Sequence, residues 1–281
     1  MAPKPRRWTV RSPPMAKVPL ACAVGLVMMA LLFFPIVTRG GAMGHDGPVA
    51  SGGGNRGEVV PDWEHPDTVA FFRDREADVR LTEIVDSGAV RPPTPALDVG
   101  CAAGRNAVYL AERGFPGVAV DASAAMAAAT RERLEPFAAS APWTVLHRPM
   151  TELDDLSDAS FGLVLALGVL QNAPDDVTFA LVLDHLARLA RPGARVLIQN
   201  FGPDSLPHGE PLQRVPGSAH VWSGFDQADA SRAYTLPDPD ALDALVTERG
   251  MELVAPTRVV WKEMKGGRRT TIIGDYRKRS T

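Results

Sequence analysis

The fold is decided by one stretch of sequence, Ala96-Leu-Asp-Val-Gly-Cys-Ala-Ala-Gly-Arg-Asn-Ala-Val-Tyr-Leu110. The short apolar segment at its start is typical of a buried strand, and the spacing after the second glycine is typical of a helix. Gly100 and Gly104 stand between them, where a tight turn can bring the backbone close to a ligand. Ala102 stands where a middle glycine would be expected, and its methyl group fits such a turn if its φ angle is negative.

The flanking segments extend this strand–turn–helix unit. The helix that starts at Arg105 ends before Gly114, and 117–121 has the pattern of a second strand, so the three segments form a βαβ unit. A leading helix is predicted from the apolar positions Val69, Phe72, Leu81, Ile84 and Val85. Further helices are predicted over 123–137, along the apolar face that runs from Phe179 to Leu189, and over 238–249. Further strands are predicted over 143–147, 161–167, 195–201, 254–264 and 268–276.

Alternating strands and helices indicate a parallel sheet covered by helices on both faces. The last two predicted strands are joined by the turn Lys265-Gly-Gly-Arg268, so the final strand runs antiparallel. The sequence therefore predicts an α/β, Rossmann-like three-layer sandwich around a seven-stranded, mostly parallel sheet with an antiparallel last strand. Ligands of such sheets bind beyond the carboxyl ends of the strands.

Charge and composition narrow the class of ligand. Residues 1–42 hold six basic residues and no acidic one, which leaves 24 basic against 33 acidic residues in the rest of the 281-residue chain. An acidic domain excludes a nucleic-acid footprint and favours a small-molecule substrate. The two cysteines, Cys22 and Cys101, are too few for a disulfide framework or a cysteine-based zinc site. The six histidines show no short metal-ligand spacing, so no metal site is predicted.

The N-terminus carries an almost continuous apolar segment, 18–37, which has about the length of a bilayer-spanning helix. The basic residues before it would leave the rest of the chain outside the cytoplasm. Three interpretations of 1–42 stay open: a membrane anchor, a cleaved signal peptide, and a start codon placed too early, with translation beginning near Met43. Residues 43–65 are predicted to be a flexible Gly-rich linker, and 66–281 the folded domain.

Four motifs in order resemble the class I S-adenosylmethionine-dependent methyltransferases. They are the turn 98–104, Asp121 at the end of the second strand, the strand Ser160-Phe-Gly-Leu-Val164, and the segment Arg188-Leu-Ala-Arg-Pro-Gly193. Ala102 and Gly162 depart from the family pattern, which has a glycine and an aspartate at these positions. The likeness spans 67–276 and is closer to the small-molecule enzymes, including the ubiquinone-biosynthesis and tellurite-resistance types. No Asn-Pro-Pro-Tyr type motif follows the fourth strand, which argues against the nucleic-acid branch.

The resemblance implies S-adenosylmethionine as the cofactor. It assigns cofactor contacts to Asp98, Gly100, Ala102, Gly104, Asp121, Ser123, Met150, Thr151 and Gly168. Asp121 would accept hydrogen bonds from the ribose hydroxyls, and Asp98 would lie near the amino group of the methionine end. Met150 or Thr151 would lie beside the adenine. As isolated residues, Asp121 could instead cap the following helix and Asp98 could form a turn.

Methyl transfer is an in-line displacement, so alignment matters more than acid–base groups. His208 and His220, in the predicted substrate-side loop 201–235, are weak candidates for a general base and equally fit as surface residues. Trp222, Phe225 and Tyr234 of the same loop would form either an apolar lid or an anchor to the sheet. Gln171 and Asn172 would face the substrate or cap the next helix.

Two other functions stay open. One is a non-catalytic protein that keeps the fold for binding, either as an S-adenosylmethionine-binding protein or as a membrane-tethered sensor or partner subunit. The other is a nicotinamide oxidoreductase, which is disfavoured because the Gly-x-Gly-x-x-Gly pattern needs its last glycine at position 105, where Arg105 stands. Since S-adenosylmethionine is a cytosolic cofactor, the catalytic domain is expected in the cytoplasm, with or without an anchor.

Overall fold

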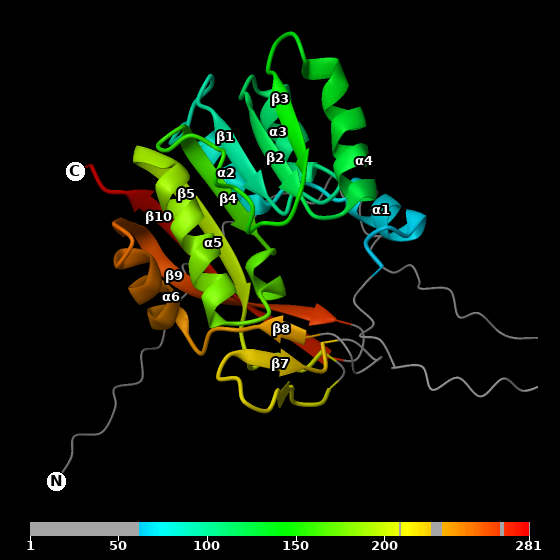
Figure 1. Cartoon of the computed structure of the whole chain (residues 1–281), viewed down its shortest axis with the longest axis vertical. Coiled ribbons are helices and arrows are strands. Elements are labelled where there is room, and N and C mark those ends of the chain that lie inside the picture. Colours follow the sequence, from blue (N-terminus) through cyan, green and yellow to red (C-terminus); the bar gives the residue numbers. More distant parts are fainter. Residues whose placement is uncertain (1–61, 208, 226–231, 265–266, 281) are drawn as a thin grey trace, which may run out of the picture. The chain divides into compact units, whose positions relative to one another are not determined.

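The computed structural model describes residues 62–207, 209–225, 232–264 and 267–280. Its main sheet has seven strands in the order β3-β2-β1-β4-β5-β10-β9 (Figure 1). The strands are β1 (Ala96–Val99), β2 (Gly117–Asp121), β3 (Trp143–His147), β4 (Phe161–Leu167), β5 (Ala190–Phe201), β9 (Met251–Met264) and β10 (Gly267–Lys278). Strands β1 to β5 pair in parallel, and β10 runs antiparallel to both β5 and β9. The predicted fold class is confirmed.

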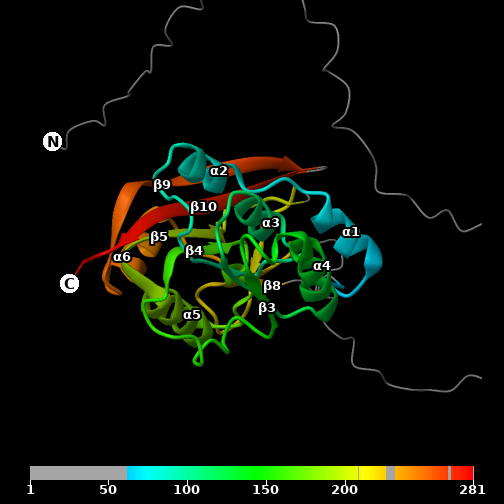
Figure 2. The same cartoon turned by 90° about the horizontal axis from the view of Figure 1, so that it is seen from above.

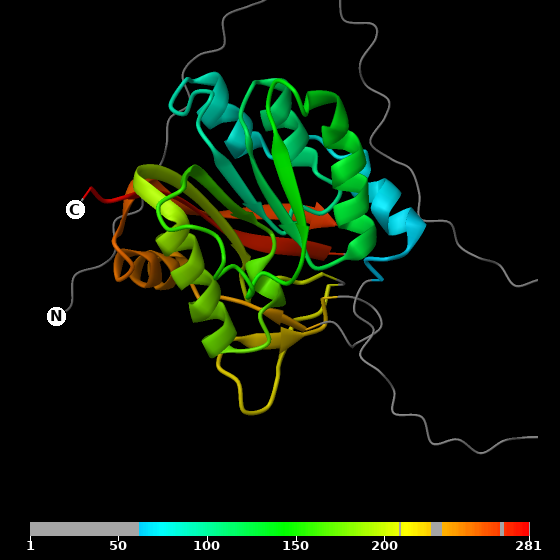
Figure 3. The same ribbon diagram turned by 45° about the horizontal axis from the view of Figure 1, so that its top comes forward.

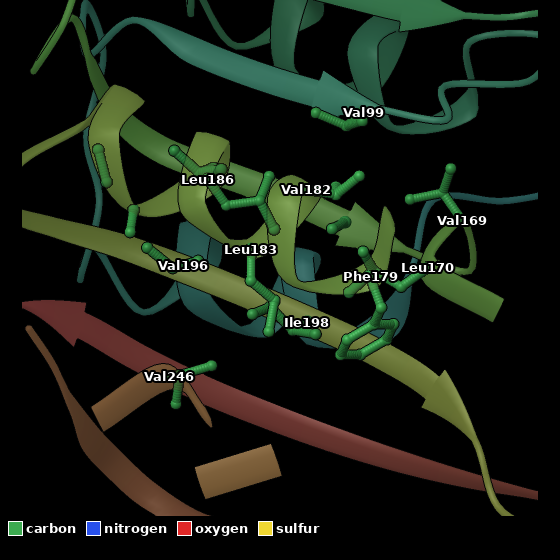
Figure 4. Packing of buried hydrophobic residues seen from close by; sticks show 14 of the residues in the cluster. Val99, Val169, Leu170, Phe179, Val182, Leu183, Leu186, Val196, Ile198 and Val246 are labelled. Atoms are coloured by element: carbon green, nitrogen blue, oxygen red, sulfur yellow. The ribbon is translucent and has the colours of Figure 1, made fainter. Parts of the chain in front are cut away.

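Helices cover both faces of this sheet, as Figure 2 shows for α2 and α5 on opposite sides. On one face lie α2 (Val79–Asp86), α3 (Arg105–Glu112) and α4 (Ala124–Leu134), and on the other lie α5 (Asp176–Leu189) and α6 (Pro239–Thr247). Strand β4 is buried along its whole length because a parallel sheet is covered on both sides. Its odd-numbered leucines pack with α2, whereas Val164 and Ala166 pack with α5. Figure 4 shows the cluster on the α5 side.

The predicted leading helix is wrong in one respect, because the structure has two helices there, α1 (Pro66–Arg73) and α2. The break coincides with the charged run 73–76, which offers no apolar side chain to bury. Asp78 then starts the second helix, since its carboxylate accepts a hydrogen bond from the backbone N–H of Arg80 at 3.1 Å. This break places charged side chains, rather than a helix surface, beside the sheet.

The predicted loop 201–235 contains a small antiparallel sheet of β6 (Gln213–Arg214), β7 (Val221–Ser223) and β8 (Arg232–Tyr234), drawn in yellow and orange in Figure 3. Tyr234 is buried and stacks on Phe179 of α5, with the ring centroids 4.2 Å apart. Of the two roles predicted for the loop aromatics, the anchoring role therefore describes Tyr234.

The apolar segment 18–37 and most of the predicted linker lie outside the described residues. Within the part of the chain that the structure describes, no helix combines the length and the apolar character needed to cross a membrane.

Candidate active site

A cavity of about 610 Å³ lies at the carboxyl ends of four neighbouring strands of the sheet. Its walls come from 100–102 after β1, 120–123 at the end of β2, 148–150 after β3, and 167–169 at the end of β4. Residues 62–64, Phe72, Arg105, Asn106 and Asn172 complete it. Both the position and the volume are typical of a small-molecule site in an α/β protein.

The turn after β1 packs directly against the segment after β4. A Cβ atom added to Gly100 would lie 2.5 Å from the Cβ of Val169, and the φ angle of Gly100 is +73°. No side chain fits there, so Gly100 brings two walls of the cavity into contact.

Ala102 adopts a φ angle of +48°, in the left-handed region, rather than the negative value under which its methyl group was expected to fit. Two hydrogen bonds hold it there. Its N–H donates to Asp121 Oδ2 at 2.7 Å, and its carbonyl accepts from Thr130 Oγ1 at 2.6 Å. The surrounding structure thus imposes a backbone conformation that alanine itself disfavours.

Asp121 ends β2 and lines the cavity. Besides the bond from Ala102, its Oδ1 accepts from the N–H of Ser123 at 2.9 Å, so part of the predicted capping role is present. Burial raises the pKa of Asp121, and these two backbone hydrogen bonds act in the opposite direction. A carboxylate has about four lone-pair directions, so two remain for a ligand in the cavity.

Asp98 lies two residues before Gly100 and is 1% exposed. Its Oδ2 has no hydrogen-bond partner among the described residues. Burial raises its pKa to about 7, while the charge of Arg105 and a hydrogen bond from Asn106 lower it and the charge of Asp121 raises it. A buried carboxyl oxygen without a donor, next to a cavity, fits a ligand that brings a positive charge or an N–H group.

The front wall of the cavity comes from residues that the sequence placed in the linker. The carboxylate of Glu64 accepts hydrogen bonds from the N–H groups of Ala124 and Ala125, both at 2.9 Å. Ser123 Oγ donates to the carbonyl of Trp63 at 3.1 Å. The Trp63 ring packs against Phe72, with the centroids 5.2 Å apart. The three hydrogen bonds join residues about 60 positions apart, which no local pattern could reveal.

Of the nine predicted cofactor residues, the cavity is lined by Gly100, Ala102, Asp121, Ser123, Met150 and Gly168, and Asp98 lies buried close to it. Gly104 and Thr151 are not among the lining residues. Gly104 has φ +81°, and an added Cβ would lie 2.9 Å from Thr130, so this glycine lets α3 approach α4. The Thr151 carbonyl lies 3.2 Å from His185 Nε2.

Gly168 lines the cavity directly after the end of β4. A Cβ added there would meet nothing closer than Gln171 Nε2 at 3.8 Å and Gln199 Nε2 at 3.9 Å. Gln171 donates to the Gly168 carbonyl at 2.6 Å, and its buried Oε1 has no donor among the described residues. Asn172 lines the cavity. Gln171 is not among the lining residues, so the predicted role of both amides on the substrate side stays a prediction.

Of the two candidate bases, His220 lies outside the cavity wall. His220 Nδ1 is 2.8 Å from Asp176 Oδ1, at the start of α5, and His220 is not among the lining residues. His208 lies outside the described residues. The described part of the wall holds no histidine.

Comparison with known proteins agrees with this geometry. A methyltransferase from Methanosarcina mazei, described as S-adenosylmethionine-dependent, is 17% identical, with a TM-score of 0.55 over 70% of this chain and 98% of its own. The 1,6-didemethyltoxoflavin N1-methyltransferase of Burkholderia thailandensis is 21% identical, with a TM-score of 0.56 over 76% and 83%. Magnesium protoporphyrin IX methyltransferase from Synechocystis PCC 6803 is 17% identical, with a TM-score of 0.50 over 79% and 85%.

At these identities the likeness shows the fold. The sequence matches no curated protein. A family model described as a methyltransferase domain, however, matches residues 70–255. This match confirms the resemblance noted from the four sequence motifs, and the chain belongs to the methyltransferase domain family.

Proposed function

We propose that this protein transfers a methyl group from S-adenosylmethionine to a small-molecule acceptor. The observation that carries the proposal is the pair of carboxylates at the cavity. Asp121 lines the cavity with acceptor capacity to spare, and Asp98 is buried beside the turn with an unpartnered oxygen. The toxoflavin-precursor and protoporphyrin methyltransferases, which share the fold, support a small acceptor.

The chain's own residues fit the parts of this cofactor. Asp121 would accept the ribose hydroxyls, and Met150 would pack on the adenine. Asp98 would face the positively charged amino group at the methionine end of the cofactor. Arg105 would supply a positive charge for the carboxylate at the same end. The backbone of Gly100 and Ala102 would contact the cofactor. When bound, S-adenosylmethionine supplies a methyl group on a sulfonium, which an acceptor nucleophile attacks in line.

Alignment, rather than a protein base, is the chain's contribution to this step. The carboxylates that line the described cavity are those of Asp62, Glu64 and Asp121, and the wall holds no histidine there. His208 and His220 stay predicted candidates. The acceptor would approach the cavity beside Gly168 and Asn172, which both line it.

Isothermal titration of the full chain with S-adenosylmethionine, S-adenosylhomocysteine and NAD tests the proposal. We expect saturable binding of the first two and none of NAD. Asp121→Ala should lower the affinity for both ligands by about 10- to 100-fold, since it removes the carboxylate that would accept hydrogen bonds from the ribose hydroxyls. Asp154→Ala is the matched control, because Asp154 is exposed and remote from the cavity wall. Binding of NAD alone would favour the alternative function of a nicotinamide oxidoreductase. Binding of none of the three ligands would overturn the proposal.

We also propose that the catalytic domain lies in the cytoplasm, where its cofactor is found. A tag at the C-terminus should then be inaccessible from outside intact cells. Labelling of that tag on intact cells would contradict the proposal.

A further inference from the structure

A set of basic and aromatic side chains gathers on the α2 face of the sheet, near the part of the cavity wall that Gly168 forms. Gln199 and Phe201 lie on the same face of β5, because alternate residues of a strand share a face. Phe201 pairs with Thr271 of β10, and two residues earlier on that strand Arg269 pairs with Lys262 of β9. The register therefore places Arg269 and Lys262 on the face of Phe201.

This group is continuous with the cavity through Gln199. Its side chain lies 3.9 Å from the position of a Cβ on Gly168, and its Oε1 accepts a hydrogen bond from Arg80 Nη2 at 2.7 Å. Phe201 lies two residues, about 7 Å, further along the strand. Gln199 and Phe201 therefore connect Gly168 in the cavity wall to the basic side chains of β9 and β10.

The positive charge here is only partly neutralised. Arg80 forms a bidentate ion pair with the buried carboxylate of Asp78, and Arg105 lies 3.9 Å from the same group. Among the described residues, by contrast, no carboxylate lies within ion-pair distance of Arg75, Lys262 or Arg269. Arg75 and Arg269 are partly buried and Lys262 is exposed, so the counter-charge of a ligand could reach all three.

The electrostatics show that these cations affect one another. Burial lowers the pKa values of Lys262 and Arg269, and repulsion from Arg75 and Arg105 lowers both further. Arg269 Nε is buried and has no acceptor among the described residues. The arrangement is notable because the chain beyond residue 42 carries 24 basic against 33 acidic residues. A basic group in an acidic domain attracts anions to one place.

Aromatic rings border this positive group. The Arg269 guanidinium lies over the Phe201 ring at 4.9 Å, and the Phe225 ring centroid is 5.1 Å from that of Phe201. The site therefore combines donors for an oxyanion with an apolar surface for the body of the same molecule.

We propose that the methyl acceptor is an anion, whose carboxylate or phosphate group is bound by Arg269 with Lys262 and Arg75 beside it, and whose apolar part lies against Phe201 and Phe225. The inference rests on the proposed function, because it concerns the acceptor side of the same cavity. It makes Arg269 a determinant of specificity, not a catalytic residue.

The test uses the full chain saturated with S-adenosylhomocysteine and three probes of similar size: benzoate, phenyl phosphate and the neutral benzamide. Their affinities are measured by isothermal titration at constant ionic strength. We expect benzoate or phenyl phosphate to bind and benzamide to bind at least 10-fold more weakly. The tighter of the two anions identifies the acidic group as carboxylate or phosphate.

Arg269→Gln should lower the affinity for the anion by about 10- to 100-fold, because it removes charge-assisted hydrogen bonds. Lys262→Gln should lower this affinity less. Arg277→Gln is the matched control, since Arg277 is exposed and lies eight residues along β10, about 26 Å away. Without any anion, Arg269→Gln should unfold at the same or a higher urea concentration than the wild type, because it relieves repulsion.

Equal binding of benzamide, or equal affinities in the Arg269 and Arg277 variants, would overturn the inference while S-adenosylhomocysteine still binds. Loss of stability in Arg269→Gln without loss of anion affinity would show that Arg269 has a structural role and would also overturn it. If S-adenosylhomocysteine itself fails to bind, the proposed function fails first, so the two failures are distinguishable.

Discussion

Replacing Asp98 by asparagine is expected to stabilise the cofactor-free protein while it weakens cofactor binding. Asp98 is fully buried beside the turn, and its Oδ2 has no donor among the described residues. Burial raises its pKa to about 7, against 3.8 for an ordinary aspartate. The folded protein therefore resists ionising this group, and the neutral amide avoids the cost.

The size and sign of the effect follow from these pKa values. At about 1.36 kcal/mol per pH unit, ionised Asp98 destabilises the folded state by about 4 kcal/mol. Because the pKa is raised in the folded state, the stabilisation of the protonated group is fully present below pH 4 and is lost as the pH rises to 7. The advantage of Asp98→Asn should thus grow by about 2.6 kcal/mol between pH 5 and pH 8.

Urea unfolding at pH 5, 6, 7 and 8, without ligand, measures this difference in the free energy of unfolding. Asp78→Asn is the matched control, because Asp78 is also buried but its pKa is shifted the other way. Burial raises the pKa of Asp78, yet the hydrogen bonds and charges of Arg80 and Arg105 outweigh burial and lower it. Asp78→Asn should therefore be less stable than the wild type at neutral pH.

The reasoning would be refuted if the stability difference between Asp98→Asn and the wild type did not change with pH. A second readout is binding of S-adenosylmethionine, which should weaken in the same variant. In the wild type this binding should release protons near pH 7, because a positive ligand beside Asp98 favours its ionised form. Titration in buffers of different ionisation enthalpy detects the released protons.

The remaining predictions concern the turn after β1. Gly100→Ala should lower the free energy of unfolding by about 2–4 kcal/mol in urea, because the added Cβ meets Val169 at 2.5 Å and φ is +73°; an unchanged midpoint would contradict this contact. Gly168→Ala, with the nearest atom at 3.8 Å, should cost only the backbone strain of about 1–2 kcal/mol. Ala102→Gly should raise the midpoint by the equivalent of about 1 kcal/mol, since φ is +48°; a lower midpoint would show that the methyl group packs usefully.

The sheet could be predicted because strands buried on both faces leave apolar runs bounded by turn residues, as at 96–99 and 161–167. Asp121 could be predicted as a site residue because its position depends only on the end of a strand. The break between α1 and α2 was missed because the apolar positions from Val69 to Val85 keep helical spacing across the charged run 73–76. The break depends on tertiary contacts, such as the ion pair of Arg73 with Glu132 of α4. The left-handed Ala102 was missed because bonds to Asp121 and Thr130 hold it there.

The acceptor side depended even more on the three-dimensional arrangement. Arg269 and Lys262 become neighbours only through the register of β9 and β10, which a turn of uncertain length does not fix in sequence. Arg80 reaches Gln199 across 119 positions. Residues assembled from distant parts of the chain leave no sequence motif. The turn after β1 does leave one, because its glycines are required by the local backbone conformation.

The wall made by Trp63 and Glu64 has a consequence for the lifetime of the bound cofactor. These residues precede α1. Three hydrogen bonds hold them to the start of α4, and Trp63 packs on Phe72 and on the buried cluster of Ala103, Met126 and Ala129. None of these contacts belongs to the sheet, so the wall can open and reclose without any strand separating. Release of spent cofactor is then a local event, and a shortened chain that begins at Pro66 would keep its sheet but exchange its cofactor faster.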